Sequence, residues 1–178
     1  ELYYVRTTPV ASPVKIERPS GRSFLTSSPL AFSGDDRWIA FATSPASTGG
    51  RTTDLYVFDT NGTSEAVSVG SSNNLLPNLT VWSDDGSALY FMAAPNTTGV
   101  TAIYRAVPGG FDAPQRVSPL YPASSTSTRI AVSPDQSKIL VVGTHNNQAG
   151  VFYVDPSDTT TERRLTTGGG GLIRHGVA

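Results

Sequence analysis

The two histidines of this chain, one of them beside an arginine, are candidates to move a proton or hold an anion. His145 stands in the polar segment 144–148, which we expect to be a loop between two strands with the histidine in solvent. Arg174 and His175 are adjacent and form a candidate anion-binding pair. The other interpretation is a pair at a strand end that faces solvent or an absent neighbour, and the sequence leaves both open.

Three aspartates occupy the same place in a repeated Ser-x-Asp motif, at Asp35, Asp85 and Asp135. A ring of carboxylates could bind calcium, but calcium needs several oxygen ligands that converge on one point. A short aspartate side chain can also accept hydrogen bonds from backbone N–H groups two residues further along, which locks a turn. We expect turn locks, because the three motifs belong to separate repeats.

Motifs of the common catalytic and cofactor sites are missing from the sequence. It has no Gly-x-Ser-x-Gly nucleophile elbow and no His-Glu-x-x-His zinc motif. The glycine run 168–171 lacks the Lys-Ser/Thr pair of a phosphate-binding loop, so we interpret it as a flexible linker. The sequence therefore predicts no catalytic residue, no cofactor and no metal ligand.

Composition excludes further classes of protein. The 178 residues include 13 Lys and Arg and 14 Asp and Glu, scattered without a basic stripe, so we expect no nucleic-acid partner. The sequence contains no apolar stretch of about 18 residues, so we expect no insertion into a membrane. The absence of cysteine excludes disulfides and thiolate metal sites. The 17 Gly and 13 Pro favour many short strands joined by turns.

The elements that carry these residues follow from a repeat of about 50 residues. The second apolar segment of each repeat, at 38–41, 89–92 and 139–142, is apolar at consecutive positions, which predicts a strand buried on both faces. A third segment follows, with an apolar residue before a tyrosine: Leu55-Tyr56, Ile103-Tyr104 and Phe152-Tyr153. A first apolar segment and a polar fourth segment complete each repeat, which therefore has four strands.

We therefore predict an all-β chain, a β-propeller of four-stranded antiparallel blades with three complete blades and an incomplete fourth. The complete blades take residues 23–70, 71–120 and 121–167, while 1–22 form outer strands and 168–178 the inner strand of the partial blade. Because inner strands border the central channel, the candidate binding residues at the channel mouth are Arg129, Arg174 and His175.

The segment 133–141, Ser-Pro-Asp-Gln-Ser-Lys-Ile-Leu-Val, resembles the Ser-Pro-Asp-Gly-x-x-Ile-Ala-Phe signature of TolB-like propellers, which are bacterial relatives of WD-repeat proteins. Leu-Tyr-Val-Phe-Asp at 55–59 and Arg-Leu-Thr at 164–166 resemble the same blade. No repeat carries the whole signature; Gln136, for example, stands in place of its glycine. The resemblance implies an envelope protein with a protein partner.

We expect a non-enzymatic propeller scaffold that binds a protein or peptide partner in the periplasm or outside the cell. Two alternatives stay open: the propeller portion of a larger prolyl-oligopeptidase-like hydrolase, and a carbohydrate-binding propeller. Trp38 and Trp82 stand at different places in their repeats, which argues against the second. The ring could belong to a longer chain, close as four blades, or be completed by self-association of two chains.

Overall fold

The computed structural model is built of short β-strands. It describes residues 1–7, 11–25, 30–46, 53–62, 65–70, 75–94 and 99–166, with the backbone alone at 75–78. These residues contain no helix, and so none that could cross a membrane. The all-β prediction is confirmed for this part of the chain.

Two of the sheets have four antiparallel strands in sequence order, each strand paired with the next along the chain. Blade 2 consists of β8 (Leu75–Trp82), β9 (Leu89–Ala93), β10 (Ala102–Ala106) and β11 (Gln115–Arg116). Blade 3 consists of β12 (Thr126–Val132), β13 (Ile139–His145), β14 (Gln148–Val154) and β15 (Glu162–Arg164).

Blade 1 has the same plan, but two segments share the place of its first strand. It consists of β3 (Arg22–Phe24), β4 (Ala31–Phe32), β5 (Trp38–Pro45), β6 (Asp54–Asp59) and β7 (Val67–Ser68). Both β3 and β4 pair with β5, one with its last residues and the other with its first. The long β5 therefore needs two partners to satisfy the backbone groups of its inner edge.

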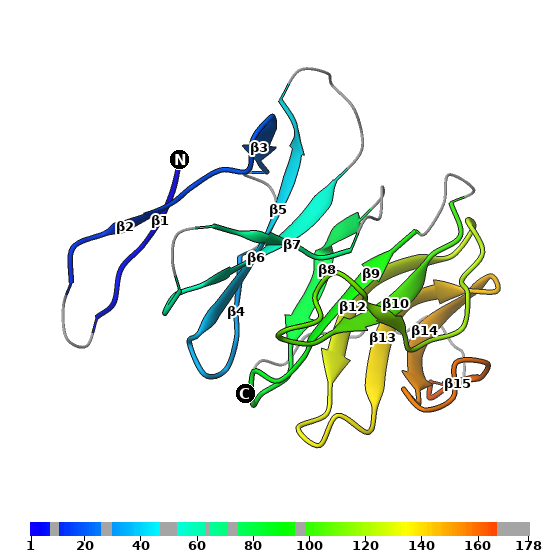
Figure 1. Cartoon of the computed structure of the whole chain (residues 1–178). Helices are drawn as coiled ribbons and strands as arrows, with labels where there is room; N and C mark the ends of the chain where they lie inside the picture. The colour runs from blue at the N-terminus through cyan, green and yellow to red at the C-terminus, as the bar shows by residue number, and fades with distance from the viewer. Residues whose placement is uncertain are drawn as a thin grey trace.

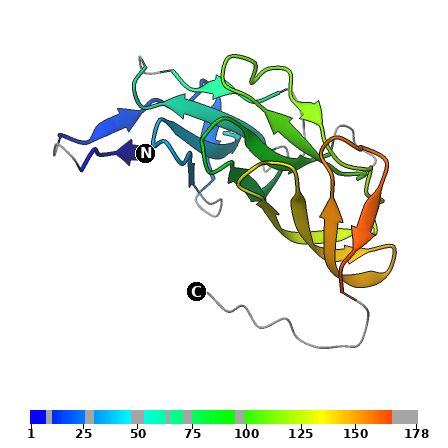
Figure 2. The same ribbon diagram turned by 90° about the horizontal axis from the view of Figure 1, so that it is seen from below.

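A two-stranded sheet precedes the blades. This N-terminal pair joins β1 (Leu2–Tyr4) to β2 (Val14–Ile16) in antiparallel register. The N-terminal pair and the three blades follow one another in chain order from one end of the molecule to the other (Figure 1). Figure 2 shows the same succession from below, with the N-terminal pair and blade 3 at opposite ends.

Neighbouring sheets pack face to face, and alternate residues of the second strand contact different neighbours. In β9, Leu89 and Phe91 pack in the core between blades 1 and 2, whereas Tyr90 and Met92 pack in the core between blades 2 and 3. All of β9 is buried, as its consecutive apolar residues predict. The N-terminal pair packs on blade 1 in the same manner, with Ile16 in that core.

Blade 3 departs from the predictions at Leu140 and at Tyr153. Leu140, expected in a strand buried on both faces, is 39% exposed, because no described element covers that face of the sheet. The alignment of Phe152-Tyr153 with the other apolar-Tyr pairs is off by one residue. Tyr56 and Tyr104 pair with Phe41 and Phe91, whereas the residue that pairs with the equivalent Val141 is Phe152. Tyr153 consequently points to the opposite face.

Candidate functional site

The Ser-x-Asp turns that join the first and second strands are held by their own side chains. In blade 2, Ser83 Oγ donates to Asp85 Oδ1 at 2.7 Å and accepts from the backbone N–H of Ala88 at 2.9 Å. Asp85 Oδ1 also accepts from the backbone N–H of Ser87 at 3.0 Å. Residues 33–38 and 133–138 repeat these bonds. The aspartates therefore lock turns, as the sequence predicts.

These hydrogen bonds act on the acidity of the carboxyls. The hydroxyl of Ser83, followed by the backbone and hydroxyl of Ser87, lowers the pKa of Asp85 to about 2. Ser133 and Ser137 lower the pKa of Asp135 to about 2 in the same way. In the described ranges, no three His, Asp or Glu side chains gather as a metal site would require.

Adjacent turns also touch one another across the blade boundaries. Gln136 has a positive φ of 57° and donates from Nε2 to Ser87 Oγ at 2.8 Å and to the Asp85 carboxylate at 3.2 Å. The hydroxyl of Tyr90 donates to Oε1 of Gln136 at 3.1 Å. At the other boundary, a Cβ on Gly34 would overlap the carbonyl oxygen of Asp84. The turns therefore form a continuous surface, here called the turn face.

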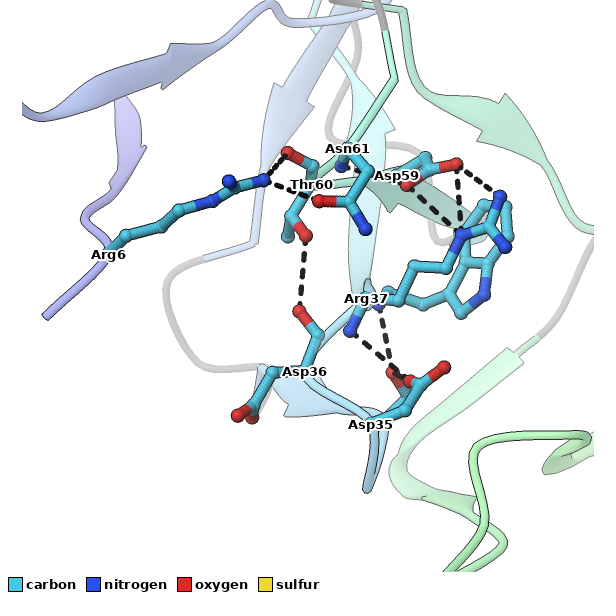
Figure 3. A network of polar contacts seen from close by, with 9 residues as sticks. Arg6, Asp35, Asp36, Arg37, Asp59, Thr60 and Asn61 are labelled. Atoms are coloured by element: carbon cyan, nitrogen blue, oxygen red, sulfur yellow. Dashed lines mark hydrogen bonds and ion pairs between the residues drawn. The ribbon is translucent and has the colours of Figure 1, made fainter. Parts of the chain in front are cut away.

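The turn face has a cleft of about 450 Å³ where the N-terminal pair meets blade 1. One wall is the segment that follows β1, whose Arg6 reaches toward the turn after β6 (Figure 3). The guanidinium of Arg6 donates to the carbonyl oxygen of Thr60 at 2.8 Å and to Oδ1 of Asn61. Tyr4 donates its hydroxyl to the same carbonyl at 3.0 Å. These bonds fix the arginine at the rim while leaving it exposed.

The opposite wall of this cleft is the first Ser-x-Asp turn. Asp36 lines it with φ at 57°, and its carboxylate has no hydrogen-bond partner among the residues drawn in Figure 3. Phe32 also lines the cleft and is 53% exposed. An arginine, an exposed carboxylate and an open aromatic ring thus surround one hollow. Such a mixture can hold a peptide through its charges, its backbone groups and an apolar side chain.

Arg37 and Asp59 brace the turn beside this cleft. The guanidinium of Arg37 donates to the carboxylate of Asp59, with the shortest distance 3.0 Å, and lies 4.8 Å from the ring centre of Trp38. The hydrogen bond from Arg37 lowers the pKa of Asp59. Trp38 in turn packs edge-on against Phe111 of the neighbouring blade, with ring centres 5.2 Å apart. The brace therefore connects the cleft to the core.

A second cleft of about 500 Å³ lies at the boundary of blades 2 and 3. Its lining includes Gln136 and Lys138 from the β12–β13 turn and Asp155 from the β14–β15 turn. The hydroxyl and backbone N–H of Ser157 lower the pKa of Asp155. Each cleft is thus formed partly by the turn between the first and second strands of a blade and partly by the turn between its third and fourth strands. These two turns lie at the same end of an antiparallel sheet. The clefts share the turn face.

His145 is not in a solvated loop, which corrects the prediction from sequence. It is the last residue of β13 and is 2% exposed, because Asn146 and Asn147 alone make the turn, with φ of 51° and 60°. The imidazole lies between the rings of Tyr121 and Phe152, each with its centre 4.5 Å away. The histidine is therefore part of the core of blade 3.

Both ring nitrogens of His145 have partners. Nδ1 lies 2.8 Å from Oε1 of Glu162, and because a carboxylate accepts, this nitrogen carries the hydrogen. Nε2 lies 2.9 Å from Oγ of Ser127. The order Ser-His-Glu is that of a nucleophile, a base and an orienting acid, but the imidazole is enclosed by aromatic rings and lines neither cleft. The arrangement ties β12, β13 and β15 together.

Of the three candidate binding residues from the sequence, the structure describes only Arg129. Arg129 lies on β12, exposed, directly after a bulge, and pairs with Val142; its place at a channel mouth stays a prediction. Arg174 and His175 lie outside the described residues, as does the glycine run 168–171. Sequence reasoning missed Arg6 and Asp36 as cleft residues. The signal for Asp36 was available, since it replaces a glycine of the repeat at a position with positive φ.

No family model and no curated protein matches this sequence. Solved structures match its fold. TolB from Acinetobacter baumannii superposes with a TM-score of 0.58 at 20% identity, over 87% of this chain and 35% of that one. Dipeptidyl peptidase 4 from Porphyromonas gingivalis superposes with a TM-score of 0.58 at 13% identity, over 78% of this chain and 24% of that one. Prolyl oligopeptidase B from Galerina marginata superposes with a TM-score of 0.56 at 17% identity, over 79% of this chain and 20% of that one.

These similarities confirm the β-propeller fold and its four-stranded blades. The chain spans about a third or less of the length of these three proteins. At such identities the fold is shared, while the activity of each protein belongs to sites that differ between members of one fold.

Proposed function

We propose that this chain is a non-enzymatic propeller scaffold that binds a protein or peptide segment at its turn face. The observation that carries the proposal is the cleft between the N-terminal pair and blade 1. It combines the guanidinium of Arg6, the carboxylate of Asp36 and the exposed ring of Phe32 around about 450 Å³. A peptide offers the matching groups, namely charges, backbone carbonyls and apolar side chains.

The setting that we propose is the periplasm or the outside of the cell. The support is the TolB-like blade signature at 133–141 together with the structural similarity to TolB. The lack of cysteine agrees with any compartment, because such a chain cannot form or lose disulfides. Detection of the native protein in periplasmic or culture-medium fractions, rather than in cytosol, tests this part of the proposal.

A peptide selection tests the binding itself. The purified chain is presented to phage that display random twelve-residue peptides, and affinities of the enriched peptides are measured by fluorescence polarisation. We expect enrichment, and at least a tenfold weaker affinity for a chain with Arg6→Ala and Asp36→Ala. The matched control removes one exposed arginine and one exposed aspartate elsewhere, through Arg116→Ala and Asp112→Ala. No enrichment would contradict the function, whereas equal affinities would place the site elsewhere.

A second candidate is the propeller portion of a larger hydrolase. It is favoured by the similarity to dipeptidyl peptidase 4 and to prolyl oligopeptidase B. In that case the catalytic groups belong to another domain, and the turn-face clefts are not ligand sites, so the phage selection yields nothing. Hydrolysis of Gly-Pro-p-nitroanilide by the purified chain, abolished by one serine substitution, would contradict the non-enzymatic proposal.

The carbohydrate-binding alternative has less support from the structure. Sugar-binding propellers would present aromatic rings at matching, exposed positions of successive blades. Trp82 is 6% exposed, with Nε1 donating to the carbonyl oxygen of Ala31, and Trp38 packs on Phe111. Both indoles therefore serve the core between blades 1 and 2.

A further inference from the structure

Each boundary between blades follows one packing rule. The second strand of the later blade contributes alternate residues to the shared core, as Leu89 and Phe91 do toward blade 1. The second strand of the earlier blade contributes the residues of opposite parity, as Tyr90 and Met92 do toward blade 3. Tyr90 and Met92 are each 1% exposed. In the described part of the chain, a sheet face with this pattern is therefore covered where a neighbouring blade is present.

One face of blade 3 has the residue pattern of a blade boundary, but no described neighbour packs on it. Leu140 and Val142 hold the places of Tyr90 and Met92, and Leu140 is 39% exposed. The register puts Tyr153 and Ala131 beside Leu140, and Val151 beside Val142. We call this set the outer face of blade 3; in the described part of the chain nothing covers it. It is an apolar surface on a four-stranded sheet.

Three basic side chains lie on or beside the outer face, and one of them, Lys138, also lies near the carboxylates of Asp135 and Asp155. Arg163 pairs with Tyr153 and is exposed, and Arg129 pairs with Val142 and is exposed. The ammonium of Lys138 lies 5.3 Å from the ring centre of Tyr153. A partner that fits this face is therefore a sheet with an apolar or aromatic centre and acidic neighbours.

The opposite end of the molecule has such a surface. Leu2 and Tyr4 of the N-terminal pair face blade 1, so Tyr3 and its partner Lys15 face away from it. Tyr3 is 51% exposed, and its hydroxyl donates to Glu1 at 2.7 Å. Glu1 and Glu17 lie 3.5 Å and 3.7 Å from the ammonium of Lys15, so the carboxylates outnumber the cation.

We propose that the outer face of blade 3 binds the N-terminal pair of a second copy of this chain. The contact would continue the series of blade boundaries, with Tyr3 packing near Leu140 and Glu17 facing Arg163 or Arg129. The two surfaces lie at opposite ends of one molecule (Figure 1), so the contact joins separate copies. It is a head-to-tail contact between two different surfaces, which can close into a ring.

Sedimentation velocity of the purified chain at several concentrations tests the contact. We expect species heavier than the 18.7 kDa monomer, with a proportion that rises with concentration. Leu140→Arg or Tyr3→Ala should return the chain to the monomer. The matched control is Val67→Arg, which places the same charge at a residue that is 49% exposed on β7, and it should leave the mass distribution unchanged.

A charge exchange keeps the test independent of folding defects. Arg163→Glu should weaken association at least tenfold, and Glu17→Arg in the same chain should restore much of it, because the exchanged pair attracts again. Thermal unfolding followed by circular dichroism checks that each variant is folded. A wild-type chain that stays monomeric at every concentration would overturn the proposal. Association that survives Leu140→Arg in a folded variant would also overturn it.

Discussion

Two clusters of polar side chains in this molecule contain similar chemical groups but have different roles. The cluster of Ser127, His145 and Glu162 is closed, since the imidazole is 2% exposed between two aromatic rings. The cleft of Arg6 and Asp36 is open to solvent. Most buried polar groups are paired with other protein groups or with ordered water, because leaving them unpaired is costly. Exposed polar groups are free to exchange water for a ligand, so the open cluster is the better candidate for function.

The closed cluster should give the largest effect on stability. His145→Ala leaves Ser127 and Glu162 without their partner and creates a cavity beside Phe152, which should reduce the free energy of unfolding by about 3–5 kcal/mol. Urea denaturation measures this loss. Gln148→Ala in the same hairpin, at an exposed residue, should cost less than about 1 kcal/mol. A loss below about 1 kcal/mol for His145→Ala would mean that the cluster does not stabilise blade 3.

The Ser-x-Asp turn of blade 2 combines a buried serine with an exposed aspartate and should give an intermediate effect. Ser83 is 2% exposed, and Ser83→Ala leaves the N–H of Ala88 without its acceptor, which should cost about 1–2 kcal/mol. Ser133→Ala removes the equivalent bonds at a more exposed turn and should cost less. Equal losses in urea denaturation would show that burial does not set the strength of these turn locks.

Acid should weaken the same turns. The pKa of Asp85 and of Asp135 is lowered to about 2 in the folded chain, below about 3.9 in an unfolded one. Their stabilising contribution is therefore present above about pH 4 and is lost as the pH falls toward 2. The midpoint of thermal unfolding should fall over this range, and less steeply with Asp85→Asn and Asp135→Asn together. Asp112→Asn is the control, and an unchanged slope would contradict the assignment.

The open cleft should give the smallest effect on stability. Arg6→Ala removes the hydrogen bonds of an exposed side chain to Thr60 and Asn61, and should change the free energy of unfolding by less than about 1 kcal/mol. The same substitution should weaken binding of selected peptides. If Arg6→Ala instead destabilised the chain as much as His145→Ala, the cleft would be a structural joint and the contrast between the two clusters would disappear.

The repeat predicted the four-strand plan of the blades from local signals, but it did not predict β3, which pairs beside β4 on β5. Ser83, Asp85 and Gly86 make a turn through their own side chains and backbone. The consecutive apolar residues of β9 likewise predict burial on both faces, which the structure confirms. Leu140 breaks this pattern because burial also depends on a neighbouring sheet, and the sequence of one strand does not say whether that sheet is present.

The candidate site was harder to predict, because it depends on contacts between distant segments. Arg6 and Thr60 meet only because the N-terminal pair packs on blade 1. His145 was mistaken for a loop residue because its neighbours are polar. The pair Asn146-Asn147 carried the missing signal, since asparagine tolerates the positive φ of a two-residue hairpin turn. That turn extends the strand to His145 and directs its side chain inward.

The order of strands within blades 2 and 3 has a consequence for how the molecule could grow. Every strand there pairs with the one that follows it in sequence, so the loops that must close during folding are short and entropically cheap. Among the described strands, none of one blade is inserted into the sheet of another. Duplicating or deleting the whole segment from β8 to β11 would therefore break no ladder, and gene duplication could lengthen or shorten such a chain one blade at a time.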